Sequence, residues 1–170
     1  MRKFILPAII IAVLAVGSAV TYGLSTFHST PVTEAPTTSQ TYKKPTVSEL
    51  LDLVNTERAK NGVAALKLDE RLNQSAQRKA DDMATYHYFA HVSPHDGKHG
   101  YEYINDVGIE CGTDSENIAF STDGTDVSSS EALKSWIDSP AHFSAMIDSK
   151  YTLTGFGIVG KAIVEHFCQQ

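Results

Sequence analysis

The sequence lacks an excess of basic residues. Its 170 residues include 14 lysines and arginines against 20 aspartates and glutamates, which gives a formal net charge of −6 at pH 7. No basic patch interrupts this acidic background, and binding to the phosphates of DNA or RNA depends on one. We therefore do not expect the protein to bind nucleic acid.

Cysteine is also scarce, because Cys111 and Cys168 are the only two in the chain. In an exported protein such a pair favours a disulfide bond. This bond would tie a mid-chain loop to the last strand and contribute roughly 4 kcal/mol on the loop-entropy model. A nucleophilic cysteine is the alternative, but neither flanking sequence offers an activating group.

Two common hydrolase motifs are missing. The chain has no nucleophile elbow, and the segment "HYFAH", residues 87–91, lacks the glutamate of the zinc-protease motif HExxH. The i, i+4 spacing of His87 and His91 still leaves this pair as an alternative metal site.

The N-terminus predicts export. Arg2 and Lys3 precede an apolar run from Phe4 to about Val20, and Gly17-Ser18-Ala19 could be cleaved. Residues 1–23 are thus expected to be a signal peptide or an N-terminal membrane anchor. The basic end would stay in the cytoplasm, so the folded domain would be extracellular, either secreted or anchored to the membrane.

Residues 24–45 are rich in serine, threonine and proline and poor in core-forming residues. Such a segment cannot bury enough apolar surface to fold, which predicts a disordered tether. Residues 46–170 are then expected to form a single, monomeric domain.

Capping and turn signals divide this domain into helices followed by strands. Thr46 to Glu49 reads as a capping box for a helix that ends near residue 61, Asp69 caps a second helix, and Ser128 to Glu131 caps a third. Two strands flank Gly160 as a hairpin. This order predicts an α+β fold in which helices cover an antiparallel sheet.

Four of the seven histidines follow one another at four-residue steps, at positions 87, 91, 95 and 99. One continuous helix cannot carry all four, because Pro94 and the Asp96-Gly97 turn interrupt it. Only the first two could share a helical end.

Three polar residues lie at element boundaries beside apolar residues: His91, Glu116 and His142. Two imidazoles and a carboxylate suit a divalent transition metal, and the same groups could transfer protons. A purely structural role, in which each side chain is only hydrogen-bonded, is the competing hypothesis.

Five segments in sequence order resemble the CAP superfamily (cysteine-rich secretory, antigen 5 and pathogenesis-related proteins), especially its short prokaryotic members with SCP-like domains. The resemblance covers Leu50 to Phe167. The segments are "LVNTERAKNGVAALKLDERLNQSAQRKADDMA", "YFAHVSPHDG", "ENIAF", "SWIDSPAHFSAMID" and "YTLTGFGI…IVEHF".

The resemblance implies a three-layer α-β-α sandwich with a central antiparallel sheet and a large open cleft. In the family, two histidines and two acidic residues line this cleft, and His91, Glu116 and His142 match three of them. The fourth acid has no match, because Ser139 occupies its position. Asp138 and Glu131 are the nearby candidates.

The family also implies structural roles for several residues. Asn55 is expected to bond to the backbone and Arg58 to pair with an acid. Gly155 and Gly157 are expected to let another element pack closely against the penultimate strand.

No single reaction is shared across this fold, so the fold does not indicate an activity. Binding is favoured over catalysis because the fourth acid is missing, and binding tolerates an incomplete set of residues. The expected function is a cleft that binds a divalent metal, with zinc favoured, and a ligand that is a small molecule, a lipid or a part of the cell envelope. A metal-assisted, peptidase-like hydrolase with Glu116 as general base is the alternative. A purely structural surface domain is another alternative and ranks above the hydrolase.

Overall fold

The computed structural model describes residues 42–122 and 124–170. The predicted signal or anchor, residues 1–23, lies outside this range, as do residues 24–41 of the predicted tether. In the part that is described, no helix is long and apolar enough to cross a membrane. The helices and strands of this part all fall within one compact unit, Gln40–Gln170.

Within these residues the chain forms five helices and four strands. The helices are α1 (Val47–Lys60), α2 (Glu70–Tyr86), α3 (Gly100–Asn105), α4 (Ser129–Asp138) and α5 (Pro140–Met146). The strands are β1 (Lys67–Leu68), β2 (Asp114–Phe120), β3 (Leu153–Val159) and β4 (Ala162–Cys168).

The predicted helix starts are confirmed by their caps. The side chain of Thr46 accepts a hydrogen bond from the backbone N–H of Glu49 at the start of α1, and Asp69 caps α2 in the same way. At the start of α4, Ser128 and Glu131 form a reciprocal capping box. Each cap satisfies backbone N–H groups that have no partner inside the helix.

The strands form one sheet in the order β1-β3-β4-β2. β4 pairs antiparallel with both β2 and β3. The antiparallel sheet expected from the sequence is modified only at one edge, where the two-residue strand β1 runs parallel to β3.

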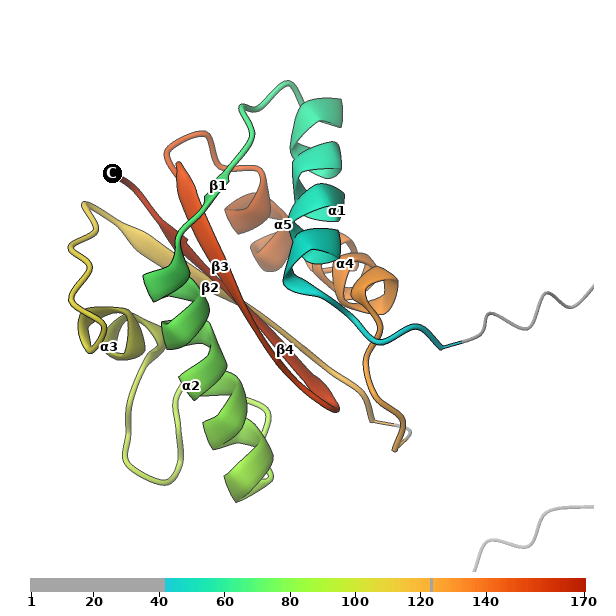
Figure 1. Ribbon diagram of the computed structural model, residues 1–170, viewed down its shortest axis with the longest axis vertical. Coiled ribbons are helices and arrows are strands. Elements are labelled where there is room, and N and C mark those ends of the chain that lie inside the picture. Colours follow the sequence, from blue (N-terminus) through green and yellow to red (C-terminus); the bar gives the residue numbers. More distant parts are fainter. Residues whose placement is uncertain (1–41, 123) are drawn as a thin grey trace, which may run out of the picture. The chain divides into compact units, whose positions relative to one another are not determined.

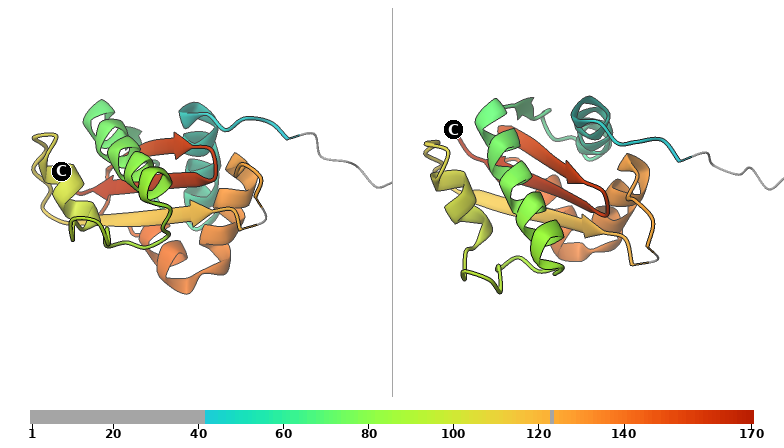
Figure 2. Two further views of the ribbon diagram at one scale, coloured as in Figure 1. Left: turned by 90° about the horizontal axis from the view of Figure 1, so that it is seen from below. Right: turned by 60° about the horizontal axis from the view of Figure 1, so that its bottom comes forward.

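The sheet lies between two layers of helices, as the resemblance implies (Figures 1 and 2). On one face α2 packs through Ala76, Ala80 and Met83 against the even-numbered residues of β4. On the other face α1, α4 and α5 build the larger core, with the fully buried Trp136 among its residues. The predicted α-β-α sandwich is therefore confirmed.

Arg58 of α1 is buried but does not pair with an acid. Its guanidinium donates to the backbone carbonyls of Ala64, Met146, Asp148 and Tyr151 at 2.7–3.1 Å. The predicted acid partner is therefore wrong, because the carbonyls of the α5–β3 connection lie within reach instead. Arg58 holds this irregular segment against α1.

Two glycines of β3 allow α2 to lie directly on the sheet. A Cβ atom at Gly155 would lie 2.2 Å from backbone atoms of Leu72 and Asn73, and one at Gly157 would lie 2.2 Å from the carbonyl of Ala76. Backbone atoms cannot give way like the end of a flexible side chain. The expected close packing is confirmed.

We expect Gly157→Ala to lower the free energy of unfolding by about 3 kcal/mol, the upper end of the usual cost of overpacking, because α2 would have to move. Urea denaturation measures this. Gly112→Ala is the matched control, since its nearest neighbour is the flexible side chain of Gln169, at 3.3 Å. Equal stability of the two variants would contradict the close approach of α2.

Glu165 of β4 is a carboxyl group inside the larger core. It is fully buried, and its Oε1 accepts a hydrogen bond of 3.1 Å from Thr154. Burial raises the pKa of Glu165 to about 8, although contacts with Thr154 and Asn117 and the charge of Arg58 oppose the shift. The carboxyl is therefore neutral at pH 7.

The raised pKa predicts a pH dependence of stability. The stabilisation by neutral Glu165 is complete below the ordinary glutamate pKa of 4.5 and is lost as the pH rises through about 8. Between these values, the free energy of unfolding of the wild type should fall by about 1.4 kcal/mol per pH unit relative to Glu165→Gln. Chemical denaturation across this range measures the difference, and parallel curves would contradict the neutral acid.

Candidate functional site

The site is organised around β2, an edge strand of the sheet. Successive side chains of a strand point to opposite faces. Glu116 contacts His91 on the face covered by α2, while Asn117 contacts the backbone of His142 in α5 on the other face. The adjacent residues Glu116 and Asn117 therefore contact both predicted histidines, His91 and His142. We call His91, Glu116, His142 and His166 the histidine site.

The carboxylate of Glu116 lies between two imidazoles. Its Oε1 is 2.7 Å from Nδ1 of His91, and its Oε2 is 3.0 Å from Nε2 of His166. The side chain of His91 is 53% exposed, that of Glu116 is 7% exposed, and His166 is fully buried. A solvent-facing imidazole is thus held by a carboxylate that is itself anchored inside the protein.

Burial by itself would raise the pKa of Glu116. The hydrogen bonds from His166 and His91, together with the charge of Lys79, outweigh it, and the net pKa is lowered. An ionised carboxylate only accepts hydrogen bonds, so Nδ1 of His91 carries the hydrogen. In the neutral ring, Nε2 of His91 is then left with its lone pair for a metal or a proton.

Lys79 of α2 holds the segment that carries His91. Its Nζ is fully buried and donates to the backbone carbonyl of His91 and to the hydroxyl of Tyr88, both at 3.0 Å. It also lies over the ring of Tyr103. Burial lowers the pKa of Lys79, and the charges of Glu116 and Asp82 oppose this. His91 is therefore fixed through both its side chain and its backbone.

His142 lies near the start of α5, which has Ser139 as its N-cap and Pro140 as its first residue. Its ring centroid is 5.6 Å from that of His91, with the ring planes at 67°. Asn117 donates to the carbonyl of His142 at 3.2 Å. Burial lowers the pKa of His142, as does the charge of His91, while Glu116 opposes the shift. The neutral, ligating form of this imidazole is favoured.

Neither candidate for the fourth acid joins these residues. Glu131 is engaged in the cap of α4, where its Oε2 accepts from the backbone N–H of Ser128 at 2.8 Å. Asp138 forms an exposed ion pair with Lys134, one helical turn away. The structure thus unites His91, Glu116 and His142 and leaves the two candidate acids elsewhere.

The other histidines of the 87–99 segment have separate roles. α2 ends at Tyr86, and His87 adopts a left-handed conformation as its C-cap, so His87 and His91 share no helix. The ring of His95 stacks on Tyr86, and His99 precedes α3. The helical metal pair considered as an alternative has no support in this geometry.

The predicted disulfide bond is confirmed. Cys111 and Cys168 are joined, and they connect the loop before β2 to the end of β4. Cys168 faces Asp114 across the β2–β4 ladder, two residues from the pair of Glu116 and His166. The bond therefore secures the register on which the histidine site depends.

Sequence reasoning missed His166. The signal was a histidine within the apolar strand sequence "AIVEHFC". Its relation to Glu116 depends on the β2–β4 register, in which the two residues face each other. Lys79 was missed for a similar reason, because a lysine in a helix gives no sign that it is buried.

His91 and His142 bring two imidazoles close together, which is the feature relevant to a metal. Two imidazoles bound to one zinc through Zn–N bonds of about 2.0–2.1 Å have ring centroids roughly 5 Å apart, close to the observed 5.6 Å. In residues 42–122 and 124–170, no group of three or more His, Cys, Asp or Glu side chains is arranged to hold a metal. Both oxygens of Glu116 already accept hydrogen bonds, which is the arrangement of a carboxylate that orients a ligating histidine.

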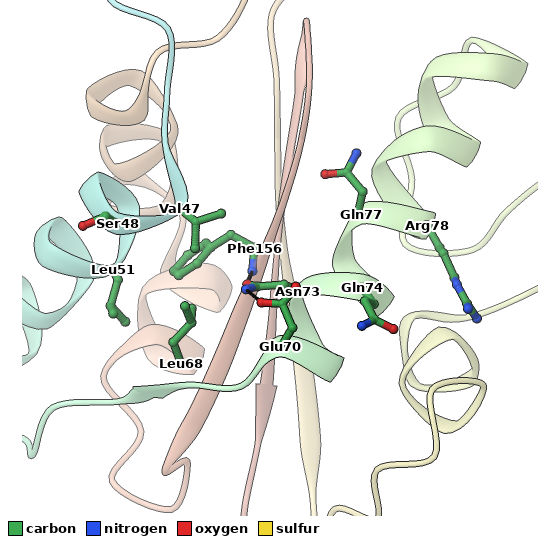
Figure 3. Close-up of a pocket in the computed structure, with 10 residues that line it drawn as sticks. All are labelled: Val47, Ser48, Leu51, Leu68, Glu70, Asn73, Gln74, Gln77, Arg78 and Phe156. Atoms are coloured by element: carbon green, nitrogen blue, oxygen red, sulfur yellow. Dashed lines mark hydrogen bonds between the residues drawn. The ribbon is translucent and has the colours of Figure 1, made fainter.

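A separate groove of about 740 Å³ lies between α1, β1 and α2 (Figure 3). Apolar residues of α1 and Phe156 form one side, and polar residues of α2 form the other. The side chain of Asn73 accepts a hydrogen bond from the backbone N–H of Phe156 at 2.8 Å, and that of Gln77 accepts one from the backbone N–H of Ile158 at 3.0 Å. These side chains cap the edge of β3, and the groove contains no residue of the histidine site.

The family model of the cysteine-rich secretory protein (CAP) family matches residues 51–168. The chain belongs to this family. Its CAP domain is 34% identical over 127 residues to the uncharacterized protein YkwD of Bacillus subtilis, covering 75% of this chain and 46% of that protein. It is 30% identical over 124 residues to the uncharacterized membrane protein YlbC of the same species, covering 72% and 34%. The chain thus spans less than half the length of these relatives.

Solved structures share the fold of the CAP domain. An extracellular SCP-domain protein of Bacillus anthracis superimposes with a TM-score of 0.67 at 23% identity, over 73% of this chain and 40% of that chain. An outer surface protein of Borrelia burgdorferi gives a TM-score of 0.64 at 17% identity, over 72% and 91%. At these identities the likeness concerns the fold alone.

In the CAP domain, Glu116→Gln should lower the free energy of unfolding at pH 7 by about 2 kcal/mol, since hydrogen bonds to a charged group contribute roughly 1.5–3 kcal/mol. The lowered pKa means that this stabilisation exists above the ordinary value of 4.5 and is lost as the pH falls through the folded-state pKa. Denaturation at a series of pH values should show the gap closing in acid. The exposed Glu110→Gln is the control, and a gap that stays constant into acid would count against an ionised Glu116.

Proposed function

We propose that this chain is an exported or membrane-tethered CAP-domain protein that binds a divalent metal, and with it a ligand at the cell surface, between His91 and His142. One observation carries the proposal. One imidazole from the loop after α2 and one from α5 lie with their ring centroids 5.6 Å apart, and the first is held by a buried carboxylate. Zinc is the favoured metal, because neutral imidazoles are common zinc ligands.

The site is suited to binding because its parts are fixed from several sides. Glu116 and Lys79 hold His91, and Asn117 holds the backbone of His142. When bound, the metal would supply a Lewis-acidic centre with open positions for a ligand. His91 would contribute Nε2, since its Nδ1 donates to Glu116.

The relatives support a place at the cell surface. The B. anthracis neighbour is described as extracellular, the Borrelia neighbour as an outer surface protein, and YlbC as a membrane protein. The apolar N-terminal segment of this chain is consistent with export, either as a cleaved signal or as an anchor.

The geometry argues against Glu116 as the general base of a hydrolase. A general base needs a free lone pair near the water that it activates. Both carboxylate oxygens of Glu116 are engaged by imidazoles, and the side chain is 7% exposed. Glu116 is therefore better placed to orient His91 than to act as the base of a peptidase.

Isothermal titration calorimetry of the purified full chain with zinc tests the proposal. The wild type should bind zinc more tightly near neutral pH than at about pH 5, where protonation removes imidazole ligands. His91→Ala and His142→Ala should each weaken binding by at least about 10-fold, because even outer-shell changes cost 10–100-fold.

His87→Ala is the matched control, because His87 lies in the same segment but forms the C-cap of α2. It should bind zinc like the wild type. Equal heats of zinc binding for the wild type and His91→Ala would contradict the proposed metal site. Loss of binding in His87→Ala together with retention in His142→Ala would assign the metal to His87 and His91 instead.

A further inference from the structure

Behind the histidine site, hydrogen bonds continue into the core. Nδ1 of His166 lies 2.7 Å from Oγ of Ser75, and Ser75 Oγ lies 3.0 Å from the backbone carbonyl of Leu72. Through Glu116, this line of contacts connects the exposed ring of His91 with the backbone of α2.

The order Ser75, His166, Glu116 is that of the triad of a serine hydrolase. The burial of its members excludes that role, because Ser75 and His166 are both fully buried. A nucleophile must reach its substrate, and here only His91 faces solvent. The inner two residues can act on a ligand only through Glu116 and His91.

The fold brings these residues together through features of packing and register. His166 faces Glu116 on β2 and Gly155 on β3. Because Gly155 has no side chain, the turn of α2 that carries Ser75 can approach the sheet. Gly100 leaves space for the carboxylate, since a Cβ atom there would lie 2.9 Å from Oε2 of Glu116.

The contacts assign the two hydrogens that face Glu116. A carboxylate only accepts, so the nitrogen of each imidazole that faces Glu116 carries a hydrogen. For His91 this nitrogen is Nδ1, and for His166 it is Nε2. Without the donor from His166, Oε2 of Glu116 would be buried with no partner, and the carboxylate would turn to find another donor. The hydrogen on Nδ1 of His91 would then no longer be fixed.

We propose that His166 and Ser75 are positioning residues, which hold Glu116 in place and thereby fix the tautomer that presents Nε2 of His91 to a metal. This inference adds to the proposed function, and the part that concerns the metal depends on that function. It assigns a role to two residues that touch neither solvent nor a ligand. His166 acts directly on Glu116, and Ser75 acts through His166.

Nitrogen-15 NMR of the histidine rings in the metal-free full chain tests the inference, because it reports which ring nitrogen carries the hydrogen. At about pH 8, wild-type His91 should show the Nδ1–H form. His166→Leu should lose this preference, whereas His166→Gln should retain it, since its amide can still donate to Glu116. His95→Gln is the control, because the ring of His95 stacks on Tyr86 away from Glu116.

Zinc affinity gives the second measurement. His166→Leu should bind zinc about 10–100-fold more weakly than the wild type, and His166→Gln should recover most of the loss. Ser75→Ala removes a single oxygen atom, and alanine is favoured in a helix, so this variant should fold. It provides the test if His166→Leu does not fold. It should weaken both the tautomer preference and the zinc affinity.

An unchanged His91 tautomer in folded His166→Leu, or in Ser75→Ala if the first variant does not fold, would overturn the inference. Failure of the proposed function has a different signature. In that case the wild type binds no zinc, while the tautomer of His91 still depends on His166.

Discussion

The alternation of side chains along β2 is the constraint on which the histidine site depends. Glu116 and Asn117 point to opposite faces because a strand has a period of two. This lets one edge strand hold the ring of His91 on the side of α2 and the backbone of His142 on the side of α5. A shift of one residue in the β2–β4 register would exchange the faces. The register is secured beside the site by the disulfide bond of Cys168.

One buried cation fixes the irregular segment that carries His91, and another fixes the segment that follows α5, the helix of His142. Lys79 bonds to the carbonyl of His91, and Arg58 bonds to the carbonyl of Met146 at the end of α5 and to those of Asp148 and Tyr151 after it. A buried cation without partners would be very costly. The segment bound to each cation can therefore adopt few other conformations without losing these bonds. The ordering of the site comes from bonds to the backbone as much as from side-chain contacts.

The fold could be predicted largely from local signals. A cap such as Thr46 with Glu49 depends on four neighbouring residues, and the glycines of β3 show that another element passes close by. The site was only partly predictable. His91, Glu116 and His142 match a family motif, whereas His166 becomes relevant only when its strand is aligned with β2. The partner of Arg58 was wrong because the sequence does not show which carbonyls a buried guanidinium will meet. Non-local register and burial are the missing information.

The same contacts that make Glu116 a good anchor limit what the site can do. Glu116 accepts a hydrogen bond at each oxygen and its side chain is only 7% exposed, so it has little access to water and it stabilises one tautomer of His91. The lowered pKa of His142 likewise favours a lone pair over a charge. Both effects leave imidazole nitrogens with lone pairs, which can accept a proton or a metal. For the proposed metal site, this organisation in advance would add affinity, because less freedom would be lost on binding.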